Sequence, residues 1–151
     1  MKLNYLILVS AVIGLCLSAR AGQLAITDDP NAGDLVLCKE GRICPVCVDD
    51  NSDQAVVRAA NDLAEDFARV TGVKAGVQRS VPASGDKICI IVGTLGQTNL
   101  VSRFSEQGRL DAAGVSNRWE SYVLQVVPHP LPNIERALVI AGSDRRGTLY
   151  G

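Results

Sequence analysis

The stretch ALVIAGSDRRGTLYG, residues 137–151, combines an apolar run, a polar turn and the start of a helix. Its first part, Ala137 to Ala141, is an unbroken apolar run, which predicts a strand buried on both faces, as in a parallel or mixed sheet. Gly142 and Ser143 end the run, and residues 144–151 read as a polar turn followed by the start of a helix. Together these elements make half of a βαβ unit. In open α/β sheets, ligands usually bind at the turn after the carboxyl end of a strand.

The candidate functional residues of this turn are Asp144, Arg145 and Arg146. Two adjacent arginines at the expected start of a helix oppose the helix dipole, which favours anions there. Gly147 and Gly151 are four residues apart, so they share a helix face that lets another backbone approach closely. Two alternatives stay open. Either the turn is merely capped, with solvated arginines, or it is a substrate-binding or domain-interface site.

Residues 1–21 are typical of a secretory signal peptide. Lys2 precedes an apolar run from Tyr5 to Ser18, which is shorter than the roughly 20 residues that span a bilayer. Small residues at Ala19 and Ala21 predict cleavage before Gly22, so we expect a secreted or periplasmic protein. A lipoprotein signal is disfavoured because a leucine, which is not small, precedes Cys16.

Residues 22–151 are expected to form one N-terminal α/β domain, a small mixed β-sheet covered by helices. The leader carries Lys2 and Arg20, so 15 basic residues become 13, against 16 acidic residues. No basic stripe remains, which excludes nucleic acid and an anionic membrane as expected partners. The chain stops inside the last expected helix, which is too short to be stable alone, so we expect the domain to be truncated at its C-terminal end.

The expected elements follow the order hairpin, helix, two strands, helix, two strands, helix. The clearest is an amphipathic helix with N-cap candidates at Asp50–Asp53 and an end at Gly72. The other expected segments are a hairpin of Leu35–Cys38 and Ile43–Val48, strands at Val73–Gln78, Lys87–Val92, Trp119–Val127 and Ala137–Ala141, a helix at Asn99–Gln107, and a stiff connector at Pro128–Pro132.

The cysteines and the single histidine give no expected catalytic site, metal or cofactor. Cys44 and Cys47 have the spacing of a redox motif, but such motifs begin a helix, whereas these residues are expected on a strand and on opposite faces. A disulfide among Cys38, Cys44 and Cys47 and buried, inert thiols both stay open, whereas a zinc site there lacks a fourth ligand. His129 lies between two prolines, a poor place for a catalytic base.

Two further kinds of site are not expected. The turn Gly93–Gly96 lacks the lysine of a phosphate-binding loop and the full dinucleotide fingerprint. No aromatic platform of the kind that sugar-binding modules offer is visible, because several of the few aromatic side chains are needed for the core. These are Phe67, Phe104, Trp119, Tyr122 and Tyr150.

Four segments together resemble the N-terminal domain of family 115 glycoside hydrolases, the xylan α-1,2-glucuronidases. They occur in the family's order and read AVVRAANDLAEDFARVTG (55–72), IIVGTLG (90–96), RWESYVLQVV (118–127) and ALVIAGSDRRGTLYG (137–151). The resemblance implies that this domain precedes a TIM-like barrel, which carries the inverting chemistry that releases glucuronic acid or its 4-O-methyl form from xylan. It also implies that the piece alone is inactive. Its partners are then the downstream barrel of the same protein and, for the full-length enzyme, polysaccharide.

Neither of two nearby carboxylates is nominated as catalytic. Glu120 is expected to begin a strand, and Asp144 has a capping role open to it. Two alternatives to the glucuronidase remain. One is the matching domain of a related hexosaminidase or other glycosidase, and the other is a stand-alone secreted accessory or carbohydrate-binding domain.

Overall fold

The computed structural model describes Thr27 and residues 31–81, 85–96 and 99–151. The expected signal peptide and its cleavage before Gly22 lie outside the described residues. Among the helices that are described, none combines the length and the apolar character needed to cross a bilayer.

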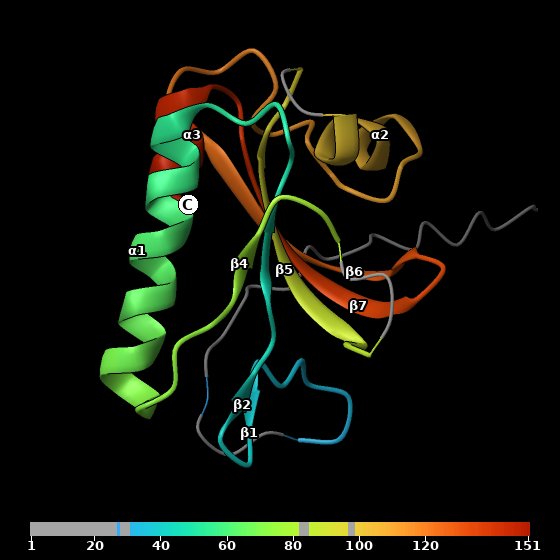
Figure 1. Ribbon diagram of the computed structural model, residues 1–151. Helices are drawn as coiled ribbons and strands as arrows, with labels where there is room; N and C mark the ends of the chain where they lie inside the picture. The colour runs from blue at the N-terminus through green and yellow to red at the C-terminus, as the bar shows by residue number, and fades with distance from the viewer. Residues whose placement is uncertain (1–26, 28–30, 82–84, 97–98) are drawn as a thin grey trace, which may run out of the picture.

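A five-stranded mixed sheet forms the centre of the fold (Figure 1). From edge to edge its strands are β4 (Val77–Gln78), β3 (Val46–Val48), β5 (Ile88–Thr94), β7 (Ile134–Gly142) and β6 (Tyr122–Leu131). The first four are parallel, and β6 runs antiparallel to β7. A separate hairpin of β1 (Cys38–Lys39) and β2 (Arg42–Ile43) completes the strands described. The expected α/β class with a small mixed sheet is confirmed.

Helices cover both faces of this sheet. Helix α1 (Gln54–Thr71) and the short α3 (Arg145–Tyr150) lie on one face, and α2 (Asn99–Glu106) lies on the other (Figure 1). Successive side chains of a strand point to opposite faces of the sheet, and here both faces are covered. Every position of a central strand is therefore buried, which explains the apolar runs in the sequence. In β7, Val139 points into the α2 core with Phe104, whereas Ile140 points into the α1 core with Val56.

The boundaries of α1 follow its sequence signals. The Asp53 side chain accepts a hydrogen bond of 2.8 Å from the Ala55 N–H, which satisfies one of the free donors of the first turn. Gly72 ends the helix in the left-handed region, with φ of 76°, a conformation that costs glycine little. The expected helix with its cap and stop is therefore confirmed.

Several expectations about strands were wrong. The expected second hairpin strand, Ile43–Val48, is divided, because Val46–Val48 belongs to the central sheet and is buried on both of its faces. The expected connector Pro128–Pro132 falls largely within β6, which continues to Leu131. Since β6 is an edge strand and is irregular between Pro128 and Leu131, the missing proline N–H groups leave few ladder bonds unmade.

The expected strand Trp119–Val127 begins later than predicted. Strand β6 starts at Tyr122, so Trp119 and Glu120 lie in the loop before it. Glu120 has φ of 53°, which is left-handed and incompatible with a strand. Glu120 therefore does not begin a strand as expected. It belongs to the loop that precedes β6.

Gly147 lies where α3 meets this loop. A Cβ atom built on Gly147 would stand 2.2 Å from the Ser121 carbonyl oxygen, far inside contact distance. At Gly151 a Cβ would stand 2.7 Å from Cγ2 of Ile140. The close backbone approach expected at these two glycines is therefore present at Gly147, where the neighbour cannot rotate away, whereas Gly151 meets side chains instead.

We expect Gly147→Ala to lower the free energy of unfolding by about 1–3 kcal/mol or more, because the added methyl group forces α3 and the loop apart. Urea denaturation measures the loss. Gly114→Ala is the matched control, since a Cβ there meets nothing within 4 Å, and its effect should stay within about 0.5 kcal/mol. Equal stability of the two variants would contradict this account of the contact.

Candidate functional site

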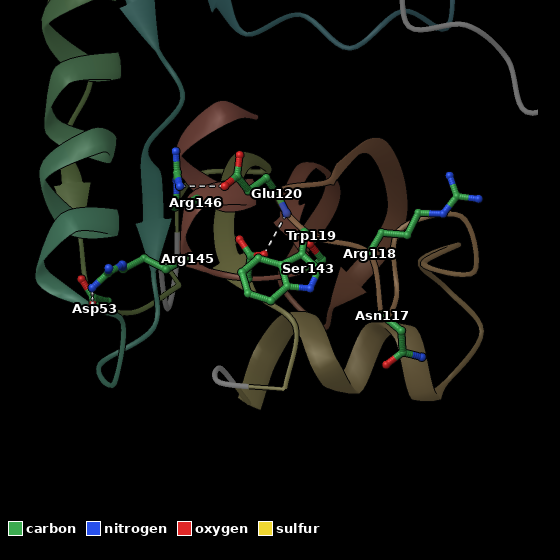
Figure 2. A pocket seen from close by; sticks show the side chains of 9 residues that line it. Asp53, Asn117, Arg118, Trp119, Glu120, Ser143, Arg145 and Arg146 are labelled. Carbon is green, nitrogen blue, oxygen red and sulfur yellow. Dashed lines mark hydrogen bonds and ion pairs between the residues drawn. The ribbon is translucent and has the colours of Figure 1, made fainter.

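A pocket of about 580 Å³ lies at the end of the sheet where the parallel strands have their carboxyl ends (Figure 2). Three segments form it: the N-cap of α1, the loop before β6 and the turn after β7. The lining residues are Asp53, Asn117, Arg118, Trp119, Glu120, Ser143, Asp144, Arg145 and Arg146. The turn 144–146 therefore lies at the sheet edge where ligands bind in open α/β folds.

Asp144 joins two of these segments. Its Oδ1 accepts a hydrogen bond of 2.7 Å from the Gly147 N–H and so caps α3. Its Oδ2 accepts a hydrogen bond of 2.8 Å from the Glu120 N–H, 24 residues earlier in the chain. The backbone N–H groups of Glu120 and Gly147 hold the pKa of Asp144 below its usual range. Both carboxylate oxygens are engaged, so Asp144 is a structural cap rather than a free base.

Neighbouring serines strengthen the same junction. The Ser143 N–H donates to the Ser121 carbonyl oxygen at 2.8 Å, and the Ser121 N–H donates to Ser143 Oγ at 3.1 Å. On the other side of α3, Thr148 Oγ1 lies 2.7 Å from Thr94 Oγ1 in a buried contact with the end of β5. The turn after β7 is thus fixed to both the preceding loop and the sheet.

The two candidate arginines each have an acidic neighbour. Arg145 Nη1 lies 3.5 Å from Asp53 Oδ2, and Arg146 Nη1 lies 2.7 Å from Glu120 Oε1. Arg146 also donates to the Tyr150 hydroxyl at 3.0 Å, and this bond together with the Glu120 charge raises the pKa of Arg146. The arginine side chains keep 57% and 62% of their surface exposed, so within this chain each pair contributes at most about 1 kcal/mol.

Four residues that line the pocket were not predicted from the sequence as parts of a site: Asp53, Asn117, Arg118 and Trp119. No aromatic platform was expected from the sequence, and the structure leaves one aromatic side chain, Trp119, 88% exposed beside the pocket. Asn117 and Glu120 flank the loop with left-handed φ values of 63° and 53°. Asparagine tolerates this conformation, so Asn117 was a usable signal for a tight turn, but nothing in the sequence marks Glu120.

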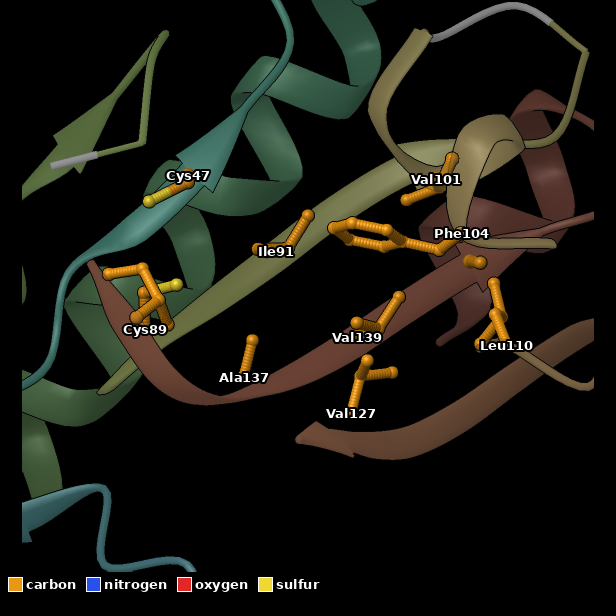
Figure 3. Close-up of a cluster of buried hydrophobic side chains, with 11 residues drawn as sticks. Cys47, Cys89, Ile91, Val101, Phe104, Leu110, Val127, Ala137 and Val139 are labelled. Carbon is orange, nitrogen blue, oxygen red and sulfur yellow. The ribbon is translucent and has the colours of Figure 1, made fainter. Parts of the chain in front are cut away.

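The cysteines lie elsewhere in the fold. Cys47 lies on β3, whereas Cys44 lies between β2 and β3 and not on a strand as expected. Cys44 contacts the core on the α1 side and Cys47 belongs to the core on the α2 side, so the two residues do face opposite sides (Figure 3 shows Cys47 and Cys89). Burial raises the pKa of the Cys44 thiol to about 12, which disfavours the reactive thiolate. A side-chain hydrogen bond with Cys89 lowers the pKa of Cys47 and raises that of Cys89.

The four cysteines that the structure describes, Cys38, Cys44, Cys47 and Cys89, are free thiols. The disulfide considered among the first three stays a prediction. Among the described residues, no group of three or more His, Cys, Asp or Glu side chains is arranged to hold a metal ion. His129 is exposed in the irregular part of β6, where its carbonyl oxygen accepts a hydrogen bond of 3.1 Å from Arg109. Neither the cysteines nor His129 line the pocket.

Comparison with known proteins finds a likeness among solved structures. No protein-family model matches the chain, and no curated protein is significantly similar to it. A solved structure described as "a novel family GH115 4-O-Methyl-alpha-glucuronidase, BtGH115A, with specificity for decorated arabinogalactans" matches with a TM-score of 0.51 and 28% sequence identity. The match covers 70% of this chain and 12% of that chain. The domain is therefore similar to a small part of a glycosidase.

The junction at Asp144 has a testable dependence on pH. A depressed carboxyl pKa stabilises the fold above the ordinary aspartate value of about 3.9, and this stabilisation is lost as the pH falls through the lower folded-state value. We expect Asp144→Asn to lower the midpoint of urea unfolding at pH 7, because the amide accepts only one of the two N–H groups. The difference from wild type should shrink near pH 3. Asp62→Asn on the exposed side of α1 is the control. If the difference in urea midpoint between Asp144→Asn and wild type were as large near pH 3 as at pH 7, the role of the charge would be contradicted.

Proposed function

We propose that this chain is the non-catalytic N-terminal domain of a secreted glycoside hydrolase that removes glucuronic acid, or its 4-O-methyl form, from a polysaccharide. The observation that supports it is the likeness to the GH115 glucuronidase, at 28% identity over 70% of this chain. The match covers 12% of that structure's chain, so the glucuronidase activity is part of this proposal and not of the comparison. The sequence resemblance to xylan α-1,2-glucuronidases favours xylan as the substrate. The likeness to the solved structure, whose description names decorated arabinogalactans, gives the alternative substrate.

The chemistry of the pocket supports a non-catalytic role. Inverting glycosidases need two carboxyl groups about 6.5–9.5 Å apart, one to protonate the leaving oxygen and one to activate a water. Here Asp144 is held by two backbone N–H groups, and Asp53 and Glu120 lie in ion pairs with arginines. Each nearby carboxylate is thus engaged in the fold. We assign the acid and the base to a downstream barrel of the same protein.

The gene beyond codon 151 tests this proposal most cheaply. We expect barrel-coding sequence there, and we expect the longer gene product to release glucuronic acid from glucuronoxylan or from decorated arabinogalactan. N-terminal sequencing of the exported protein should begin at Gly22. A natural stop after codon 151, with a stable secreted product, would favour the stand-alone accessory domain instead, and a barrel that hydrolyses only hexosaminides would favour the hexosaminidase.

The pair Arg145 and Arg146 has a proposed place in the longer protein. At least one of them faces the barrel, where its planar fork pairs with a barrel carboxylate or with the anionic sugar. The ion pairs seen here with Asp53 and Glu120 preposition the two guanidinium groups at the pocket. Their surface stays more than half exposed in this chain, so both remain accessible to a second partner.

We expect Arg145→Ala or Arg146→Ala to cost about 1 kcal/mol or less in the 151-residue chain, where the pairs are exposed. In the barrel-containing protein, one of the two should cost about 3–5 kcal/mol, because the substitution leaves a buried partner uncompensated. Urea unfolding and glucuronidase activity, with each variant made separately, measure the difference. Arg58→Ala on the exposed side of α1 is the control. Wild-type stability and activity in both variants would show that the arginines are merely solvated.

A further inference from the structure

Strand β6 forms one edge of the central sheet, and its pairing with β7 decides which backbone groups point away from the sheet (Figure 1). The Ser143 N–H donates to the Ser121 carbonyl oxygen, and these two residues continue the β6–β7 register by one pair. Hydrogen-bonded positions alternate along an antiparallel pair. The backbone groups of Val123, Gln125 and Val127 therefore also point toward β7, and those of the residues between them point outward.

The carboxyl end of β7 supports the same alternation. The Gly142 carbonyl oxygen accepts a hydrogen bond from the Leu95 N–H just after β5, so the backbone of Gly142 faces away from its β6 neighbour Tyr122. The outward groups of β6 thus belong to Tyr122, Leu124 and Val126. Among the residues that the structure describes, none bonds to these three N–H groups. The edge offers alternating free donors and acceptors to a further strand.

The sequence of this edge leaves it unprotected. Natural edge strands usually carry lysine, proline or a bulge that discourages pairing, but residues 122–127 read YVLQVV and contain no charge or proline. Aromatic and β-branched residues of this kind favour strand pairing. Tyr122 is 43% exposed, and Leu124 is only partly buried against the α1-side core. The prolines and the irregular pairing of β6 begin only at Pro128.

The limits of the open stretch are symmetric about Leu124. Four residues before it, Glu120 has a left-handed φ of 53°, and its N–H is already bound to Asp144. Four residues after it, Pro128 has no N–H to donate. If a second copy pairs antiparallel about Leu124, Glu120 of one copy lies opposite Pro128 of the other. The residue that lacks a free donor then meets the residue that has left the strand, so neither interrupts the pairing.

We infer that two copies of this chain associate by antiparallel pairing of their β6 edges, with a two-fold axis at Leu124. Leu124 pairs with its own counterpart, and Tyr122 of each copy pairs with Val126 of the other. Each pair exchanges two hydrogen bonds, so the register uses every outward donor between residues 122 and 126. It also places an aromatic side chain beside a β-branched one, with no like charges directly opposite.

This symmetry is the reason for choosing a second copy rather than an unrelated strand. A register centred one residue earlier would set Val126 opposite Glu120, and one centred a residue later would set Tyr122 opposite Pro128, so both lose bonds. An unrelated peptide would have no need for limits at equal distances from Leu124. The inference goes beyond the proposed function, because the contact uses only this chain and requires no catalytic barrel.

Sedimentation equilibrium of the exported chain should show a reversible dimer with a dissociation constant of about 10–100 μM, since one strand pair is a small interface. Amide hydrogen exchange locates the contact. The amides of Tyr122, Leu124 and Val126 should exchange several-fold more slowly at about 1 mM than at about 10 μM protein, as mass action requires. The Val123 and Val127 amides, which point toward β7, should stay protected at both concentrations.

Two variants weaken the pairing in different ways. Tyr122→Pro removes an outward donor from each copy without removing a bond to β7, and it should weaken the dimer by about tenfold or more. Leu124→Lys places two ammonium groups opposite each other on the axis and should weaken the dimer by at least about as much. Val70→Lys is the matched control, because Val70 is an apolar side chain on α1 that is 86% exposed, and it should leave the dimer unchanged. Circular dichroism checks the fold of each variant, and Tyr122→Pro decides the matter if Leu124→Lys does not fold.

Three results would overturn the inference. One is a chain that stays monomeric up to about 1 mM. Another is protection of the three edge amides that does not depend on concentration, which would show that the edge is covered from within the chain. The third is a dimer that a folded Tyr122→Pro variant leaves unchanged, which would place the interface elsewhere. The proposed glucuronidase relation does not depend on these results, because the gene sequence and the Arg145 and Arg146 variants test it separately.

Discussion

The carboxylate of Asp144 is the point on which the arrangement of the pocket depends. It accepts from the Gly147 N–H and from the Glu120 N–H, at 2.7 Å and 2.8 Å, and so joins the turn after β7 to the loop before β6. Helix starts leave backbone N–H groups without partners, and a charged acceptor satisfies them more strongly than a neutral one. One side chain thereby begins α3 and fixes a loop that is 24 residues distant in sequence.

The glycine pattern and the pocket follow from this junction. Gly147 lets the Ser121 carbonyl oxygen approach closely enough for the carboxylate to reach both N–H groups. With the loop held there, Glu120 meets Arg146, and Trp119 is left exposed at the rim. The antiparallel pairing of β6 with β7 carries the loop to the carboxyl edge of the parallel strands. The site is therefore a consequence of topology and of one shared acceptor.

The sequence was sufficient for elements whose signals are local. The apolar run at 137–141, the α1 helix with its stop at Gly72, and the inward Val101 and Phe104 of α2 were all predictable from periodicity and caps. The pairing of the strands was not predictable in the same way, because Val46–Val48 reads equally well as a hairpin strand or as a buried parallel strand. The position of Trp119 was also beyond reach, since it depends on a hydrogen bond between segments far apart in sequence.

The candidate site was predictable only in part, for the same reason. Asp144, Arg145 and Arg146 stood out because cations at a helix start and paired glycines break local rules. Their partners Asp53 and Glu120 are ordinary acidic residues in the sequence, and only the fold brings them to the arginines. A substrate-binding turn and a capped structural turn looked like alternatives, yet in the structure Asp144 caps the helix and also lines the pocket.

Amide hydrogen exchange at Glu120 and Gly147 reports on the two hydrogen bonds that the Asp144 carboxylate accepts. If the Asp144 carboxylate holds both N–H groups, the two amides should be protected in the wild-type chain and should lose protection together in Asp144→Asn. The Leu110 amide, which donates to the Phe104 carbonyl oxygen outside this junction, serves as the internal reference. Exchange of both amides at the rate of an unstructured peptide in the wild type, or protection that survives the substitution, would contradict the account.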